Sequence, residues 1–165
     1  MTSGVDLLRG LALQTGLTYL DIAGVTDEAD NDYAGQMAAA LDALDHHDVV
    51  FVHVEAPDEA SHAGDAEGKV RALENIDALM VAQVIARRQA GDDLRILVMP
   101  DHPTPVAIKT HVAEPVPFVM WGAGVPANGA RAFTEKEARA TDFAVAPGHL
   151  LLQRFLAADC GLAGS

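Results

Sequence analysis

Residues 49–62 read Val-Val-Phe-Val-His-Val-Glu-Ala-Pro-Asp-Glu-Ala-Ser-His, and the architecture can be built outward from this stretch. Its first half is an apolar run rich in β-branched residues, which is typical of a buried strand. Its second half is a polar loop that contains Asp58 and His62. In α/β proteins, ligand sites lie at the carboxyl ends of strands, so the loop after this strand is a candidate site.

A second stretch repeats the arrangement. The apolar run Ile96–Met99 is followed by Asp101 and His102, and His111 comes shortly after them. Two predicted strands therefore each end in a loop that contains carboxylate and imidazole side chains. In an α/β protein, such loops lie at the carboxyl edge of the sheet, where metal and ligand sites are built.

Helix and strand patterns alternate along the whole chain. Helices are predicted where apolar residues recur every three or four positions, and strands where short apolar runs are bounded by turn residues. The alternation predicts one α/β domain with a mainly parallel sheet flanked by helices. The predicted helices are Val5–Leu13, Tyr33–Leu44, Glu67–Arg88 and a closing helix that begins near Pro147, and the predicted strands are Thr18–Ile22, Asp48–Val54, Leu94–Met99 and Val116–Trp121.

The composition excludes several classes of protein. The chain has 165 residues, half of them apolar, which is enough for one domain with a real core. Its formal net charge of −13 argues against nucleic-acid binding, which needs a basic face. There is no apolar stretch of membrane-spanning length and no signal-peptide pattern, so we expect a cytoplasmic protein without a membrane partner. Cys160 is the single cysteine, which excludes an intramolecular disulfide and a thiolate-bound structural metal.

The residue types in the two loops suit divalent metal ions. Asp58 and His62 are four positions apart, so a helix there would place them on one face. Asp101 and His102 are adjacent, and in a loop they either converge on one ion or bind two. Carboxylate and imidazole ligands without thiolate are typical of Mn²⁺ or Zn²⁺. Taken alone, the Asp58–His62 spacing is also common by chance, and Asp101-His102-Pro103 also fits a turn in which Asp caps local backbone amides. Together with His111, the five candidate ligands are too many for one tetrahedral site and favour two ions that share a phosphate.

Other polar residues near the loops have both structural and functional interpretations. His53 lies within a strand pattern and is expected to be a hydrogen-bonded core histidine. Lys109 is either a substrate-binding residue that meets a phosphate or a solvated surface lysine. Glu55 and Glu59 flank the predicted ligands and are placed to support them. Asp65 is expected to cap the long helix.

Several segments together resemble one known family. They are Val52–His62, Pro100–Pro105, Lys109–His111 and Pro115–Phe118. These motifs closely resemble the archaeal-type cofactor-independent phosphoglycerate mutases, which belong to the alkaline phosphatase superfamily. The resemblance runs from the first predicted helix to the last and so covers nearly the whole chain. It implies a three-layer α/β sandwich with a mainly parallel sheet, of which residues 1–165 form the C-terminal part.

The resemblance also assigns roles to individual residues. Asp58, His62 and His111 match the family's ligands for one metal ion, and Asp101 and His102 match two ligands of a second ion. In the family, two divalent ions activate a serine that carries the phosphoryl group between 3-phosphoglycerate and 2-phosphoglycerate, without 2,3-bisphosphoglycerate as a cofactor. We therefore expect Mn²⁺ or Zn²⁺ as the metal and a phosphoglycerate or a similar phosphate ester as the substrate.

The departures from the family pattern concern its N-terminal side. The family's aspartate ligand, its serine nucleophile and most of its substrate-binding lid precede the matched segment, and Ser3 aligns with the approach to the first helix. We therefore expect no catalytic nucleophile in this chain and an inactive isolated chain. The expected partner is the missing N-terminal portion or a second copy, because truncation exposes an apolar face. The alternatives are a related phosphatase or phosphotransferase, and a non-catalytic subunit from a truncated or split gene.

Overall fold

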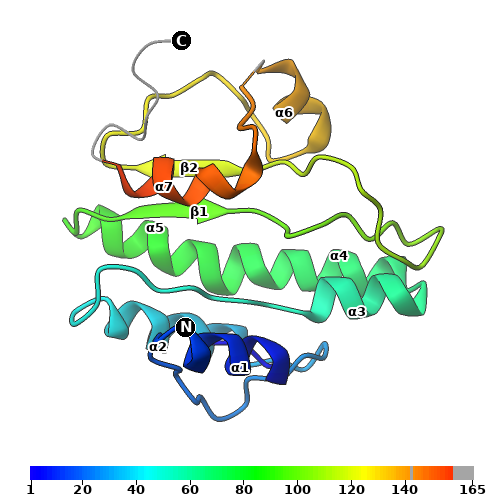
Figure 1. The fold of residues 1–165 in the computed structure, drawn as a ribbon, viewed down its shortest axis with the longest axis horizontal. Helices are drawn as coiled ribbons and strands as arrows, with labels where there is room; N and C mark the ends of the chain where they lie inside the picture. The colour runs from blue at the N-terminus through cyan, green and yellow to red at the C-terminus, as the bar shows by residue number, and fades with distance from the viewer. Residues whose placement is uncertain (142, 158–165) are drawn as a thin grey trace. The chain divides into compact units, whose positions relative to one another are not determined.

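The computed structural model describes residues 1–141 and 143–157 and divides them into two compact units. The chain leaves unit 1 after Arg87, near the end of α5 (Ala82–Gln89, Figure 1), and returns to it for Thr104–His111. Cys160 lies outside the described residues. Unit 1 consists of Met1–Arg87 and Thr104–His111, and unit 2 consists of Arg88–Pro103 and the described residues from Val112 onward.

Helices dominate the first half of the chain, where the sequence predicted alternating helices and strands. Two of these helices begin at an aspartate cap: an Asp32 carboxylate oxygen accepts a hydrogen bond from Gly35 N at 2.9 Å, and an Asp65 oxygen accepts one from Gly68 N at 2.8 Å. The helices are α1 (Asp6–Gln14), α2 (Tyr33–Ala43), α3 (Ala56–Ala63), α4 (Ala66–Asn75) and α5 (Ala82–Gln89), with the π-helical segment η1 (Ile76–Val81) between α4 and α5.

The predicted long helix is confirmed, because α4, η1 and α5 follow one another without a break (Figure 1). Helix α3 packs against α4, and α2 packs against η1. Met80 and Val84, on the predicted apolar stripe, are buried, with 2% and 5% of their surface exposed. Val70 and Leu73, on the same stripe, are 54% and 51% exposed. One end of the apolar stripe is thus packed and the other faces outward.

Of the two strands predicted in unit 1, one forms only a single bridge and the other does not form. Within Asp48–Val54, Val52 forms an isolated parallel bridge with Thr2, in which Thr2 N donates to Phe51 O at 2.9 Å and His53 N donates to Thr2 O at 3.0 Å. The prediction of a strand at Thr18–Ile22 is wrong, since this segment is not in a ladder. Its hydrogen bonds to Met1, from Met1 N to Thr18 O at 2.6 Å and from Leu20 N to Met1 O at 2.8 Å, do not continue into a ladder. Periodicity along one segment does not reveal how far such pairing extends.

Unit 2 contains a small sheet. Strands β1 (Arg95–Val98) and β2 (Val119–Gly122) pair antiparallel, with Arg95 opposite Gly122 and Val98 opposite Val119. Both strands lie largely within predicted strand segments. A Cβ atom at Gly122, where φ is +128°, would lie 2.4 Å from Leu94 O, so this register requires glycine. The described residues thus form a mixed helix and strand fold with a two-stranded sheet.

The C-terminal elements of unit 2 are short helices. The predicted closing helix is confirmed, and α6 was not predicted. The Arg95 guanidinium donates to the carbonyl oxygens of Phe155 and Ala157 at 2.8 and 2.6 Å, which ties β1 to the end of the closing helix. These elements are α6 (Glu135–Ala140), the 3₁₀ segment η2 (Gly148–Leu150) and α7 (Leu151–Leu156).

Helix α1 exposes large apolar side chains. Leu7, Leu11 and Leu13 are 70%, 48% and 62% exposed, and Ala12 is the buried residue of this helix. In the part of the chain that the structure describes, no helix is long and apolar enough to cross a membrane.

Candidate metal centre

Helix α3 presents Asp58 and His62 on one face. Pro57 lies in its first turn, and Gly64 ends it in the left-handed conformation with φ +80°, which is the usual way in which a helix stops. Because the residues are one helical turn apart, their side chains meet: His62 Nε2 lies 3.0 Å from Asp58 Oδ2. The spacing noted in the sequence therefore does bring these two predicted ligands together.

His111 joins them from the segment that returns to unit 1. Its Nε2 atom lies 3.1 Å from His62 Nε2 and 3.6 Å from Asp58 Oδ1. The two imidazole rings are tilted by 54° with centroids 5.0 Å apart, so the rings meet at their edges. Asp58, His62 and His111 thus form a cluster, called the ligand trio below, although His111 is far from the others in sequence.

The ligand trio fits a divalent metal ion. Ligand atoms placed at about 2.0–2.1 Å around a tetrahedral ion lie roughly 3.3 Å from one another. The two contacts of His62 Nε2, at 3.0 Å to Asp58 Oδ2 and 3.1 Å to His111 Nε2, are close to this value, and the 3.6 Å contact of His111 Nε2 is with the other Asp58 oxygen, Oδ1. Two nitrogens and one carboxylate oxygen are a common donor set for Zn²⁺ and related ions, and they leave a coordination position for another ligand.

Hydrogen bonds from outside the trio orient its members. His62 Nδ1 lies 3.0 Å from Lys109 O, and since a carbonyl only accepts, Nδ1 carries the proton and Nε2 presents its lone pair to the trio. The Thr104 hydroxyl donates to Asp58 Oδ1, and Thr104 is 5% exposed. Lys69 Nζ in turn donates to Thr104 O at 2.9 Å.

Thr104 and Lys69 were not singled out by the sequence. The one available signal for Thr104 is its position between Pro103 and Pro105, directly after the Asp-His pair. That composition indicates a constrained loop, but it does not indicate which carboxylate the hydroxyl meets. Ser61 is fully buried, and its hydroxyl donates to Pro57 O at 2.6 Å.

His53 is hydrogen-bonded, as predicted, but its side chain is 23% exposed, so the expectation of a core position is wrong. Its Nδ1 lies 2.9 Å from Ser3 Oγ, and its Nε2 lies 3.2 Å from a Glu55 oxygen. Ser3 is 2% exposed, so its hydroxyl does not face the solvent from which a phosphate ester would enter. Carboxylate oxygens of Glu55, Asp58 and Glu59 lie within 4.8 Å of one another, which places both glutamates beside the trio.

Asp101 and His102 belong to unit 2, in the loop that follows β1. Asp101 Oδ1 accepts a hydrogen bond from His102 N at 3.0 Å, and Asp101 Oδ2 lies 3.4 Å from His102 Nε2. The first contact is the Asp-capped turn that the sequence left open. The second contact shows that this turn leaves the other carboxylate oxygen beside the imidazole. The local geometry is therefore compatible both with a capped turn and with a pair of metal ligands.

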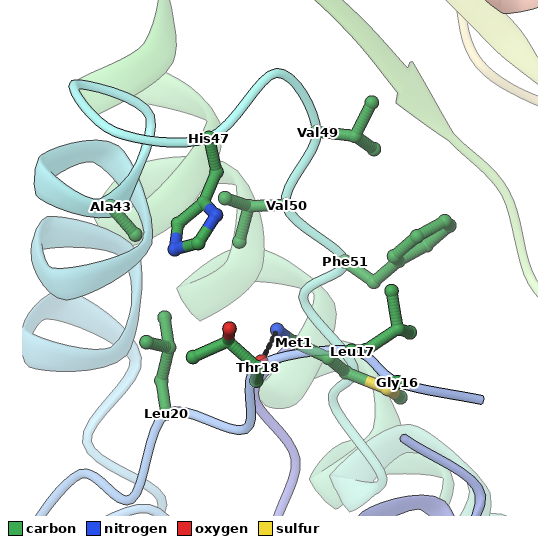
Figure 2. Close-up of a pocket in the computed structure, with 10 residues that line it drawn as sticks. All are labelled: Met1, Gly16, Leu17, Thr18, Leu20, Ala43, His47, Val49, Val50 and Phe51. Carbon is green, nitrogen blue, oxygen red and sulfur yellow. Dashed lines mark hydrogen bonds between the residues drawn. The ribbon is translucent and has the colours of Figure 1, made fainter. Parts of the chain in front are cut away.

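Unit 1 also contains a pocket of about 150 Å³, whose lining residues are drawn in Figure 2. Its lining includes the apolar side chains of Leu20, Val50 and Phe51, together with His47. The Met1 ammonium donates to Thr18 O at 2.6 Å, and burial lowers the pKa of this ammonium. The predicted ligands are not among the lining residues, so the pocket does not contribute to the candidate centre.

Comparison with known proteins agrees with a metal centre. The family model for the metalloenzyme superfamily matches residues 15–156, and the chain therefore belongs to this alkaline-phosphatase-like superfamily. The chain is 42% identical over 156 residues to the 2,3-bisphosphoglycerate-independent phosphoglycerate mutase of Methanothrix thermoacetophila. It is 42% identical over 155 residues to the probable enzyme of the same name from Geobacter sulfurreducens.

These matches cover most of this chain and a minor part of the relatives. They include 94% and 93% of this chain but 40% and 39% of the two relatives, so the chain spans about 40% of their length. The solved structure of the PH0037 protein from Pyrococcus horikoshii is also similar, with a TM-score of 0.75 and 27% identity. That likeness covers 84% of this chain and 42% of the other.

Proposed function

We propose that this chain is the C-terminal part of a metal-dependent phosphoryl-transfer enzyme that interconverts 3-phosphoglycerate and 2-phosphoglycerate. The observation that carries the proposal is the ligand trio, in which Asp58, His62 and His111 lie within 3.6 Å of one another. The names of relatives at 42% identity supply the reaction. As those names indicate, the reaction is independent of 2,3-bisphosphoglycerate.

In this proposal the metal ligands are divided between two ions. Asp58, His62 and His111 hold one ion, and Asp101 and His102 supply two ligands to the other. Mn²⁺ or Zn²⁺ suits both sets, because each combines carboxylate oxygen with imidazole nitrogen. When bound, such ions supply Lewis acidity that stabilises phosphoryl charge and lowers the pKa of a coordinated hydroxyl.

The chain's own residues orient ligands and substrate. Thr104 holds the Asp58 carboxylate, and the Lys109 carbonyl fixes the proton of His62 on Nδ1. Lys109 also remains our candidate contact for the substrate phosphate. Its ammonium donates to Ala63 O at 3.1 Å, and an ammonium has further N–H donors available.

The complete fold, in this proposal, is a three-layer sandwich with a mainly parallel sheet. The parallel bridge between Thr2 and Val52 and the likeness to the Pyrococcus horikoshii structure support it. The remaining ligands, the nucleophile and the lid would come from residues beyond these 165, or from a separate subunit. The exposed leucines of α1 would then pack against that portion or against a second copy. A cytoplasmic location follows from the proposed role in sugar-phosphate metabolism.

The test is a mutase assay with 3-phosphoglycerate and added Mn²⁺ or Zn²⁺. We expect no turnover by residues 1–165 alone, and turnover by the full-length gene product or by a complex with the product of an adjacent upstream gene. Reading the DNA upstream of Met1 decides which of these to express. Hydrolysis of many phosphate esters without mutase activity would instead identify a related phosphatase, and turnover by the isolated chain would contradict the division of the site.

A further inference from the structure

Lys109 has a backbone conformation that lysine rarely adopts. Among the described residues, it is the one non-glycine residue with a positive φ, at +55°. The left-handed region is unfavourable for a residue with a Cβ atom, and such outliers persist where the surrounding structure holds them.

The conformation ends a short helical turn. Ile108 N and Lys109 N both donate to Pro105 O, at 3.1 and 3.0 Å. A left-handed residue at the end of such a turn redirects the chain, a position usually taken by glycine. Here the redirection aims the Lys109 carbonyl at His62 Nδ1, 3.0 Å away, and His111 follows two positions later. One backbone feature thus serves both histidines of the trio.

The side chain of Lys109 also contacts α3, the helix that carries His62. Its Nζ donates to Ala63 O at 3.1 Å, and Ala63 is the last residue of α3. A cation at this end of a helix satisfies a carbonyl that lacks a helical partner. Gly64 leaves the space, because a Cβ atom there would lie 2.4 Å from Lys109 Cε.

We propose that Lys109 is a positioning residue that acts through His62. Its left-handed backbone presents the carbonyl that keeps the His62 proton on Nδ1, and its ammonium fixes the end of α3 next to His62. Together they keep the Nε2 lone pair directed at Asp58 and His111. The inference rests on the proposed metal centre, and it assigns to Lys109 a role distinct from a contact with substrate.

Two substitutions separate the backbone role from the side-chain role. Lys109→Gly removes the ammonium but adopts a positive φ freely, so the carbonyl stays in place. Lys109→Val removes the ammonium and also disfavours the left-handed backbone, because valine is β-branched. We therefore expect a larger effect from valine than from glycine. Lys136→Val, at an exposed lysine on α6, is the matched control.

The readout is Co²⁺ binding by the 165-residue chain, followed by the visible absorption of the bound ion. Loss of a hydrogen-bond partner of a metal ligand lowers metal affinity by about 10–100-fold. We expect Lys109→Val to raise the Co²⁺ dissociation constant within this range and to change the absorption spectrum, Lys109→Gly to raise it less, and Lys136→Val to leave it unchanged. Wild-type affinity in both Lys109 variants, with affinity lost in His62→Ala, would overturn the positioning role and leave the metal centre intact.

A second measurement does not depend on metal. Two-bond ¹H–¹⁵N correlation spectra of the metal-free chain report which nitrogen of His62 carries the proton. We expect Nδ1–H in the wild type and in Lys109→Gly, and a shift toward Nε2–H in Lys109→Val. An Nε2–H tautomer in the wild type would refute the inference. Absence of Co²⁺ binding by the wild type, with the Nδ1–H tautomer present, would instead refute the proposed metal centre.

Discussion

Replacing Thr104 with valine tests whether the hydrogen bond from its hydroxyl to Asp58 contributes to metal affinity. Thr104 is almost fully buried, and its hydroxyl donates to Asp58 Oδ1, the same oxygen that lies 3.6 Å from His111 Nε2. Valine has nearly the same shape but no hydroxyl. The substitution therefore removes one hydrogen bond with little change in packing volume.

The expected loss can be worked out from the burial of the pair. The Asp58 side chain is 20% exposed, so water replaces the missing donor only in part. A hydrogen bond to a charged group contributes about 1.5–3 kcal/mol. Loss of a partner that orients a metal ligand costs about 10–100-fold in affinity, which corresponds to roughly 1.4–2.7 kcal/mol. The two estimates agree, and we expect the Co²⁺ dissociation constant to rise at least about tenfold.

Isothermal titration calorimetry of the 165-residue chain with Co²⁺ measures this change. Thr104→Ser retains the hydroxyl and is expected to bind Co²⁺ nearly as tightly as the wild type. Thr110→Val makes the same substitution at an exposed threonine next to His111 and is the matched control. Urea unfolding of each variant shows whether the fold is retained.

Two results would refute this reasoning. If Thr104→Val binds Co²⁺ with wild-type affinity, the hydroxyl does not orient the ligand. If Thr104→Ser is as impaired as Thr104→Val while both remain folded, the effect comes from packing of the threonine methyl group and not from the hydrogen bond.

Further predictions concern stability. Gly122→Ala places a Cβ atom 2.4 Å from Leu94 O at φ +128°, so we expect a loss of about 1–3 kcal/mol in urea unfolding; unchanged stability would contradict the assigned register. Asp32→Ala removes the cap that accepts from Gly35 N, and the unfolding free energy should fall by about 1 kcal/mol, with Asp32→Asn nearly neutral. Burial, and secondarily the nearby Asp30 carboxylate, raise the pKa of Tyr33 above its ordinary value, so the folded state binds this proton more tightly than the unfolded state. The resulting stability is present below about pH 10 and is lost as the pH rises through the raised pKa; Tyr33→Phe should flatten this alkaline decline in urea midpoints, and an identical decline in both proteins would disprove the assignment.

The sequence was informative wherever the relevant interactions are local. The Asp65 cap and the periodicity of the long helix depend on residues a few positions apart, and these predictions are confirmed. The pairing of Asp58 with His62 is of the same kind, because one helical turn separates them. By contrast, the failed strand at Thr18–Ile22 depended on a neighbouring strand, which no local pattern could report.

By itself, the sequence determined the donor chemistry of this protein: carboxylates and imidazoles without thiolates, placed behind two apolar runs. Only the tertiary structure decided that His111 returns to α3, that Thr104 holds Asp58, and that Lys109 turns its carbonyl toward His62. Residue identity sets which atoms are able to bind a metal ion. Their separations and proton positions depend on contacts between segments far apart in the chain, and these exist only once the chain has folded.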